Sequence, residues 1–164
     1  MQPIRITLWF DTEAEEAARF YTSVFRDAKL GSVVRYPETG QEITGKAPGS
    51  VMFVEFELNG QPFIALNGGP QFHFTEAISL EIACADQAEI DHYWERLSEG
   101  GDPDAQSCGW LKDRFGVSWQ VSPRAVLEEL LGSDDREAIE RLYGAMFQMQ
   151  KLDIVALRRA FAGA

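Results

Sequence analysis

The stretch CGWLKDRFGVSWQV, residues 108–121, indicates how the second half of this chain of 164 residues is expected to fold. Two short runs, each with one tryptophan, lie on either side of a turn-forming segment at 113–116. Such runs, separated by a segment that contains Asp and Gly, are typical of a β-hairpin. The stretch therefore predicts two antiparallel strands that close the second half of the fold.

The second arm of this hairpin indicates which of its faces is buried. Val117, Trp119 and Val121 alternate with Ser118 and Gln120. Because side chains alternate between the two faces of a strand, we expect the apolar residues to pack against helices and the polar residues to face a cavity. The amide of Gln120 donates and accepts hydrogen bonds, which suits it to orienting an organic ligand.

The pattern that ends in this hairpin is preceded by a similar pattern in the first half of the chain. Residues 4–10 alternate as in a strand, and the cap-type residues Asp11 and Thr12 then predict the start of a helix. A short strand follows, and Asn59 and Gly60 predict a tight hairpin turn. The segment 39–50 is rich in glycine and polar residues and predicts a mobile loop that serves as a lid.

The second copy of the pattern begins about 75 residues after the first. Residues 78–84 alternate as in a strand, and 86–97 carry an apolar stripe with helical spacing. The segment 99–104 is expected to be a turn that ends this helix. A helix that links strands covers one face of their sheet, so the other face of each module is free to border a cavity.

These patterns predict an α+β fold of paired βαβββ modules followed by a C-terminal helical extension. The two fused modules are expected to occupy residues 1–123, as about 1–74 and 75–123. Residues 124–164 read as three helices, either part of the same domain or part of a dimer interface.

Composition disfavours several classes of partner. The formal net charge is −11, and acidic residues are spread along the predicted helices, so nucleic acid and anionic membranes are not expected partners. The two cysteines form no CxxC motif, which is typical of a reducing compartment. We see no signal peptide and no apolar run of membrane-spanning length, so we expect a cytoplasmic protein.

Four segments of the chain resemble one known family: ITLWFDTEAEEAARFYTSVF, NGQPFIALNGG, CGWLKDRFGVSWQVSP and AMFQMQKLDIVALRRAF. The chain resembles the PhnB-like family, which is also called 3-demethylubiquinone-9 3-methyltransferase-like. This family belongs to the vicinal oxygen chelate superfamily, with glyoxalase I, the bleomycin-resistance proteins and the extradiol dioxygenases. The resemblance implies paired βαβββ modules that form a curved sheet around a central pocket, in a homodimer.

In glyoxalase-type members, the resemblance implies a divalent metal held by residues of four strands. The matching positions here are one of 5–7, together with Ala65, Ser79 and Gln120. Ala and Ser are not good ligands for a divalent ion, and a single Gln carries no charge. We therefore expect no metal.

The methyltransferase label would require a site for S-adenosylmethionine. The commonest such site is a glycine-rich turn from a strand into a helix, and no GxGxxG motif occurs. Gly68 and Gly69 follow a predicted strand, but Pro70 and an aromatic segment come next. The sequence therefore predicts no cofactor.

Alternation predicts which side chains face the pocket, and Phe74 and Trp110 are expected beside them. The predicted pocket residues are Thr7, Trp9, Phe63, Ala65, Asn67, Phe74, Ser79, Trp110 and Gln120. Among chemical groups, Glu81 is the candidate general base, because a carboxylate on an apolar sheet face gains proton affinity. Cys108 is the candidate nucleophile, with Lys112 nearby to favour its thiolate.

Three functions stay open at this stage. The first is binding of a small organic molecule in a metal-free pocket, as the resemblance to bleomycin-resistance proteins implies. The second is an enzyme that acts on a small carbonyl or aromatic compound through Glu81 or Cys108. The third is a dimeric scaffold in which side chains fill the space between the sheets.

Overall fold

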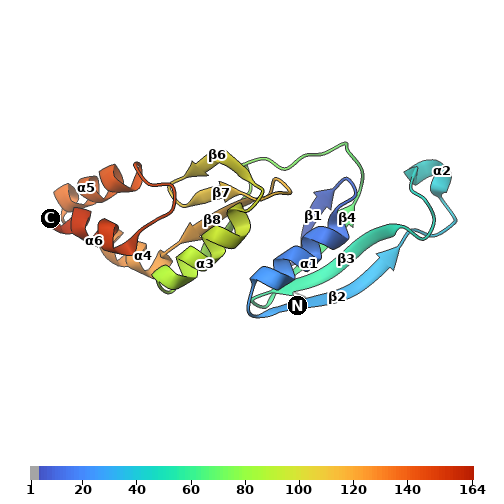
Figure 1. Ribbon diagram of the computed structural model, residues 1–164, viewed down its shortest axis with the longest axis horizontal. Coiled ribbons are helices and arrows are strands. Elements are labelled where there is room, and N and C mark those ends of the chain that lie inside the picture. The colour runs from blue at the N-terminus through green and yellow to red at the C-terminus, as the bar shows by residue number, and fades with distance from the viewer. Residues whose placement is uncertain (1–3) are drawn as a thin grey trace. The chain divides into compact units, whose positions relative to one another are not determined.

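The computed structural model describes residues 4–164, and the chain divides into two compact units, 1–74 and 75–164 (Figure 1). Each unit contains one four-stranded sheet, with strand orders β1-β4-β3-β2 and β5-β8-β7-β6. The strand order within the two sheets is equivalent. This arrangement confirms the predicted α+β fold of paired βαβββ modules.

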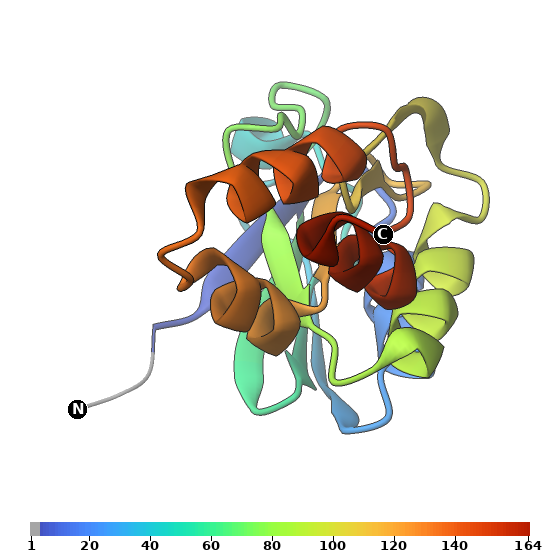
Figure 2. The same cartoon turned by 90° about the vertical axis from the view of Figure 1, so that its left-hand side faces the viewer.

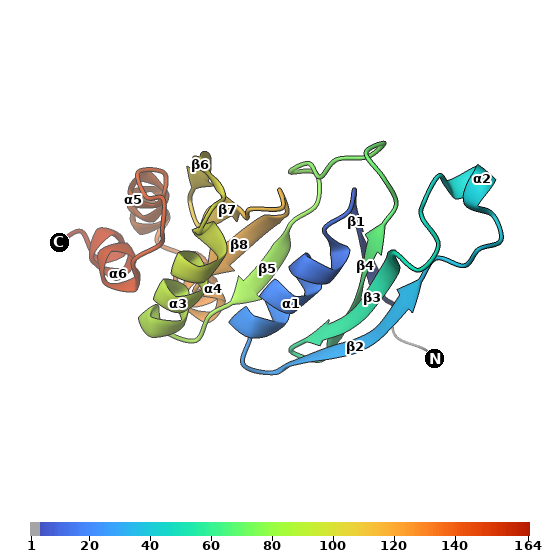
Figure 3. The same cartoon turned by 45° about the vertical axis from the view of Figure 1, so that its right-hand side comes forward.

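The first unit contains the four strands β1 Ile6–Phe10, β2 Ala28–Arg35, β3 Val51–Leu58 and β4 Gln61–Asn67, the helix α1 Ala14–Val24 and the short helix α2 Gln41–Thr44. β1 runs parallel to β4, and the other neighbours are antiparallel. Helix α1 lies along one face of the sheet (Figure 3). Its Tyr21 ring stacks on Phe56 of β3, and Phe56 stacks on Phe63 of β4, so these aromatic rings form the core of the unit.

The register of the first sheet corrects part of the predicted pocket. Phe63 and Ala65 pair with Ile6 and Leu8, on the face that α1 covers, whereas Thr7 lies on the opposite face. The expectation that Phe63, Ala65 and Asn67 share a face with Thr7 and Trp9 is therefore wrong. All three side chains are buried beside α1. The register of β4 against β1 differs by one residue from the expected one, and a difference of one residue exchanges the two faces of a strand.

Helix α1 begins later than predicted and has an unexpected cap. Its N-cap residue is Glu13, not Asp11 or Thr12, and the Glu13 side chain does not cap the helix. The backbone N–H of Ala14 instead donates to Oδ1 of Asn67, at 2.8 Å, and Nδ2 of Asn67 donates to the carbonyl of Val51. The buried amide of Asn67 is thus used to join the end of β4 to the helix and to β3.

The second unit contains β5 Leu80–Ala83, α3 Gln87–Ser98, β6 Asp102–Ser107, β7 Trp110–Lys112 and β8 Ser118–Ser122. Helix α3 is capped by Asp86, which accepts a hydrogen bond from the backbone of Glu89. The predicted apolar stripe of α3 is buried, and the helix packs on β7 and β8. Figure 3 shows α3 along one face of this sheet.

Residues 99–104 are not a turn throughout, as the sequence predicted. The chain turns at Gly100 and Gly101, and β6 begins at Asp102, which pairs with Lys112 of β7. Pro103 is tolerated in this strand because β6 lies at the edge of the sheet, where a missing backbone donor breaks no ladder. A two-residue turn at Cys108 and Gly109, both with positive φ, then joins β6 to β7.

The predicted hairpin of β7 and β8 is confirmed, and Asp113 holds its turn. Asp113 is 2% exposed, and its Oδ1 accepts hydrogen bonds from the backbone N–H groups of Phe115 and Val117. Its Oδ2 accepts a hydrogen bond from the indole of Trp119, at 2.8 Å. A single buried carboxylate thus joins the turn to a core residue of β8.

The C-terminal extension contains α4 Arg124–Leu131, α5 Arg136–Met146 and α6 Ile154–Ala162. It belongs to the same compact unit as the second module. Figure 2 shows the three helices close together, and their facing sides form an apolar cluster of Leu130, Leu142, Leu152 and Leu157. Within residues 4–164, every helix falls short of the length and hydrophobicity that a membrane span requires.

We expect Asp113→Ala to destabilise the second unit by about 3 kcal/mol, since the substitution leaves buried donors without an acceptor. Urea unfolding followed by tryptophan fluorescence measures this change. Glu95→Ala, at an exposed acidic residue on α3, is the matched control and should change stability by less than about 0.5 kcal/mol. Equal stability of the two variants would contradict the structural role of Asp113.

Candidate ligand pocket

A cavity of about 360 Å³ lies in the second unit, between its sheet and the C-terminal extension. The sheet contributes Glu81, Cys108, Gly109, Trp110 and Gln120. Glu81 and Trp110 both pair with Gln120, so their side chains lie next to that of Gln120 on one face. We call this the open face of the second sheet, because α3 packs on the other face.

The extension contributes the apolar part of the cavity wall. Leu127 comes from α4, Met146 from the last turn of α5, and Phe147 and Leu152 from the segment between α5 and α6. The cavity thus has one polar side, made by the module, and one apolar side, made by the extension. A volume of this size with few polar groups is typical of a site for a small organic molecule.

The polar groups of the sheet have fixed orientations. Nε2 of Gln120 donates a hydrogen bond to Oγ of Ser79, at 2.8 Å. This contact directs the amide, and within residues 4–164 no hydrogen bond uses the side-chain carbonyl oxygen of Gln120. That oxygen is therefore available to accept a hydrogen bond from a ligand.

Glu81 is not an isolated carboxylate. Its Oε2 forms an ion pair with Nη1 of Arg124 at 2.7 Å, and Nε of Arg124 also donates to Glu128 at 2.8 Å. The hydrogen bond to Glu128 and the negative charges of Glu81 and Glu128 raise the pKa of Arg124, which stays protonated at all relevant pH values. Any substrate of Glu81 would meet this guanidinium beside the carboxylate.

Cys108 lines the same cavity, in the turn between β6 and β7. Its side chain is half-buried, and the hydroxyl of Ser107 donates a weak hydrogen bond to its Sγ, at 3.6 Å. Lys112, which was expected to favour the thiolate, is engaged in an ion pair with Glu76, and the hydrogen bond from Lys112 lowers the pKa of Glu76. The turn, in which Cys108 has a positive φ, determines the position of this side chain.

The predicted pocket residues therefore separate into distinct groups. The structure brings Glu81, Cys108, Trp110 and Gln120 together around one cavity, with Ser79 attached through Gln120. Phe74 belongs to the first unit, where its ring meets Phe10 edge-on at 5.3 Å.

Trp9 lines a separate cavity of about 360 Å³ in the first unit. Its ring meets Phe72 edge-on, and Tyr36 and Ile43 also contribute to the wall. Ile43 lies in α2, inside the segment 39–50 that was predicted to be a lid. No periodic pattern in the sequence marks Tyr36 or Phe72, because both lie outside the strands.

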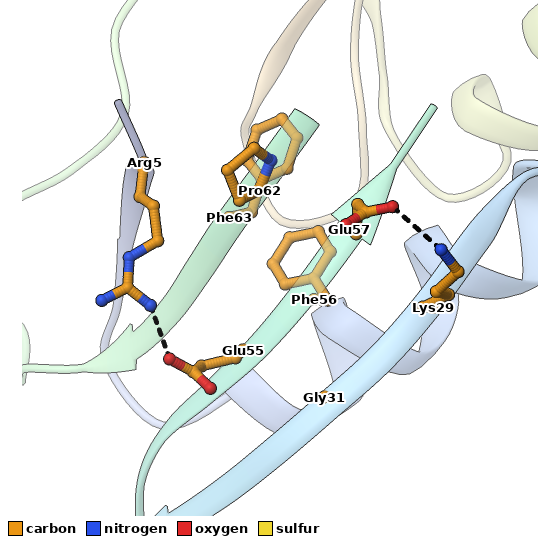
Figure 4. Close-up of a pocket in the computed structure, with 8 residues that line it drawn as sticks. All are labelled: Arg5, Lys29, Gly31, Glu55, Phe56, Glu57, Pro62 and Phe63. Carbon is orange, nitrogen blue, oxygen red and sulfur yellow. Dashed lines mark hydrogen bonds and ion pairs between the residues drawn. The ribbon is translucent and has the colours of Figure 1, made fainter. Parts of the chain in front are cut away.

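A third hollow, of about 230 Å³, lies over the face of the first sheet that α1 does not cover (Figure 4). Two ion pairs border it, Arg5 with Glu55 at 2.5 Å and Lys29 with Glu57 at 3.3 Å. Gly31 lies close to Glu55, since a Cβ at this position would be 2.9 Å from the Glu55 carbonyl oxygen. All four charges are paired and partly exposed, so this hollow offers no unmatched charge for a ligand.

The residues present do not fit the divalent metal that the resemblance to glyoxalase-type proteins implies. Among residues 4–164, no group of three His, Cys, Asp or Glu side chains is placed to hold a metal ion. Ala65 is in the core, and its neighbours Ile64 and Leu66 on the other face are apolar. The Nε2 of Gln120 already binds Ser79, which leaves only one neutral oxygen.

The glycines after β4 do not fit a nucleotide either. A Cβ on Gly68 would lie 2.1 Å from the ring of Trp9, so this glycine makes room for the indole. The indole N–H of Trp9 donates to the carbonyl of Gly69, at 2.8 Å. The chain then continues into residues 70–79 without forming a helix, so the strand, turn and helix of a dinucleotide-type site are not formed there.

Cysteine labelling tests the environment of the two thiols. Burial, followed by the charge of Glu89, raises the pKa of Cys84 to about 12. Because the thiolate is the reactive form, only about one in ten thousand Cys84 side chains would be reactive at pH 8. We expect iodoacetamide at pH 8 to alkylate Cys108 in the folded protein and to reach Cys84 only near pH 12 or after unfolding.

Peptide mass spectrometry after timed labelling distinguishes the two positions. Cys108→Ser is the control and should take up no label until urea is added. Rapid labelling of Cys84 in this folded variant would show that the thiol is accessible and would contradict its burial.

Comparison with known proteins supports the fold and the family. A family model described as 3-demethylubiquinone-9 3-methyltransferase matches residues 2–122. The PhnB protein of Bacillus cereus, whose own description is a putative 3-demethylubiquinone-9 3-methyltransferase, is 37% identical, with a TM-score of 0.62, and the match covers 74% of this chain and 98% of that protein. The protein PA1353 of Pseudomonas aeruginosa is 20% identical, with a TM-score of 0.56 and coverage of 73% and 95%, which supports the fold alone. No curated protein matches the chain.

Proposed function

The chain belongs to the 3-demethylubiquinone-9 3-methyltransferase family, and from this membership and the geometry of its cavity we propose that it binds a small organic molecule without a metal ion. The proposed site is the cavity of the second unit, with Trp110 and Gln120 as its central residues. The observation that carries this proposal is the amide of Gln120, which Ser79 orients while its carbonyl oxygen has no partner within residues 4–164.

Each wall of the cavity supports a binding role. The indole of Trp110 offers an aromatic surface for stacking, and Gln120 offers one directed acceptor. A ligand with a hydroxyl or amine group next to an aromatic ring would satisfy both. Glu81 is paired with Arg124, which it shares with Glu128, so the site presents no unpaired charge to attract an ionic ligand and suits an uncharged one.

The alternatives receive less support from the same contacts. For an enzyme, Glu81 would serve as general base, but Arg124 already occupies one of its oxygens and a substrate would compete with that contact. The scaffold alternative concerns the space between the two sheets, whereas the free space of about 360 Å³ lies within the second unit, where it leaves room for a ligand.

The proposal is tested with 4-ethylphenol, an uncharged probe with one hydroxyl group on an aromatic ring. We expect chemical-shift changes in a ¹H–¹⁵N spectrum that centre on Trp110 and Gln120. Gln120→Ala should weaken binding of the probe about five-fold, since one neutral hydrogen bond contributes about 1 kcal/mol.

Gln148→Ala is the matched control, because Gln148 is exposed on the extension and does not line the cavity. The control should bind 4-ethylphenol as the wild type does. Shift changes spread evenly over the surface, or equal affinity of the Gln120 and Gln148 variants, would contradict the proposed site.

We also propose that the protein is a metal-free homodimer, which the family resemblance and the donor set of the described residues support. Native mass spectrometry of protein purified without chelator should give twice the chain mass of 18.4 kDa, with no stoichiometric metal. Incubation with EDTA should change neither the mass nor the binding of 4-ethylphenol. One tightly bound divalent ion per chain would overturn the metal-free proposal.

A further inference from the structure

The C-terminal extension begins where the family match ends. The family model stops at residue 122, and α4 begins at Arg124. The Bacillus cereus relative is covered almost completely by about three quarters of this chain. The extension, which includes residues 145–161 that also resemble the family, therefore lies outside the matched residues, and its contacts with the cavity have no counterpart in the length that this relative has.

Two backbone hydrogen bonds join the extension to the sheet at the edge of the cavity. The N–H of Cys108 donates to the carbonyl of Met149 at 2.8 Å, and the N–H of Gly109 donates to the carbonyl of Gln150 at 2.7 Å. A Cβ on Gly109 would lie 3.0 Å from the side chain of Leu152 and from a backbone oxygen of Val121. The glycine in this turn thus permits the extension to approach the sheet closely.

A second set of contacts joins the same segment to α3. Oε1 of Gln87 accepts a hydrogen bond from the backbone N–H of Ile154 at 2.9 Å, and its Nε2 donates to the carbonyl of Leu152. Lys151 forms an ion pair with Asp91 at 2.5 Å, and the hydrogen bonds from Lys151 and then Gln87 lower the pKa of Asp91. Contacts on two sides hold residues 149–154 in one position beside the cavity.

The fixed segment determines which groups face the ligand. Leu127, Met146 and Leu152 form an apolar wall opposite the polar groups of the open face. Arg124, at the start of the extension, also pairs with the one carboxylate that lines the cavity among the described residues. The extension therefore both supplies the ion-pair partner of Glu81 and adds hydrophobic surface.

We propose that residues 124–164 act as a ligand-selecting wall, which gives the site a preference for uncharged molecules that carry a hydrogen-bonding group at one end and an aliphatic tail at the other. This inference rests on the proposed function, since it assumes that the cavity binds a ligand. The hydroxyl of such a ligand meets Gln120, its ring meets Trp110, and its tail lies against Leu127 and Met146. The wall sets how long that tail can be.

The test compares 4-ethylphenol with 4-hexylphenol, whose tail is four methylenes longer, by isothermal titration calorimetry. Leu127→Ala and Met146→Ala enlarge the apolar end of the cavity. We expect each to weaken binding of 4-ethylphenol, by about four-fold for each methylene group that the wall no longer covers, and to shift the ratio of the two dissociation constants about ten-fold toward 4-hexylphenol. Both residues are only half-buried, which makes these variants safer for folding than changes at the fully buried Leu152.

Two control variants separate the wall from general effects on the protein. Val155 lies on α6, is 63% exposed and does not line the cavity. Val155→Ala should therefore leave both dissociation constants unchanged. Leu127→Met conserves volume and should keep the wild-type ratio. Thermal unfolding of every variant shows whether it is folded. If Leu127→Ala does not fold, Met146→Ala still tests the wall.

The outcomes distinguish the wall from the proposed function itself. If Gln120→Ala weakens both probes while the wall variants leave their ratio unchanged, the inference fails and the proposed function stands. If Gln120→Ala has no effect on a probe that binds, the ligand is not in this cavity and both fail. If neither probe binds the wild type, the proposed ligand class and the wall are both overturned.

Discussion

The buried carboxylate of Asp113 is the contact on which the second unit depends. It accepts hydrogen bonds from two backbone N–H groups of the turn and from the indole of Trp119, so it fixes both the turn and a core residue of β8. With Trp119 held toward the core, the next residue of the strand must point to the open face. The direction of Gln120, and with it the polar side of the cavity, results from this contact.

The strand partners of β8 extend this constraint across the sheet. β5 and β7 flank β8 in a register that places Glu81 and Trp110 directly beside Gln120. A slip of one residue in either pair would exchange the two faces, placing Leu111 or Ile82 on the open face and a polar side chain in the core. Burial of the apolar residues therefore also sets the chemistry of the cavity, although they do not touch a ligand.

The two units show that the same architecture can lead to different interiors. In the first unit, one hollow is bordered by paired charges and another cavity by aromatic rings. In the second unit, three additional helices form an apolar cluster, and the extension gives the open face an apolar wall. The difference arises from the segment after each module, since the first sheet is succeeded by the irregular residues 68–79 and the second by α4.

Local patterns in the sequence were sufficient to predict the repeat, the α+β class, the β7–β8 hairpin and the face of Gln120, because alternation and turn residues are local signals. They misplaced Phe63 and Ala65 by one residue, since FIAL is apolar on both faces and its direction depends on pairing with β1. They also predicted a turn where β6 begins, because Pro103 and the two glycines before it favour a turn. The strand forms there only because it pairs with β7 at the edge of the sheet.

The assembly of the candidate site, in contrast, required contacts between distant segments. These are the pairing of Glu81 with Arg124, the attachment of residues 149–154 to the turn at Cys108, and the apolar wall. The residues on the sheet side of the cavity were therefore predictable, whereas the position of the extension was not, because it depends on packing between elements that no periodicity connects.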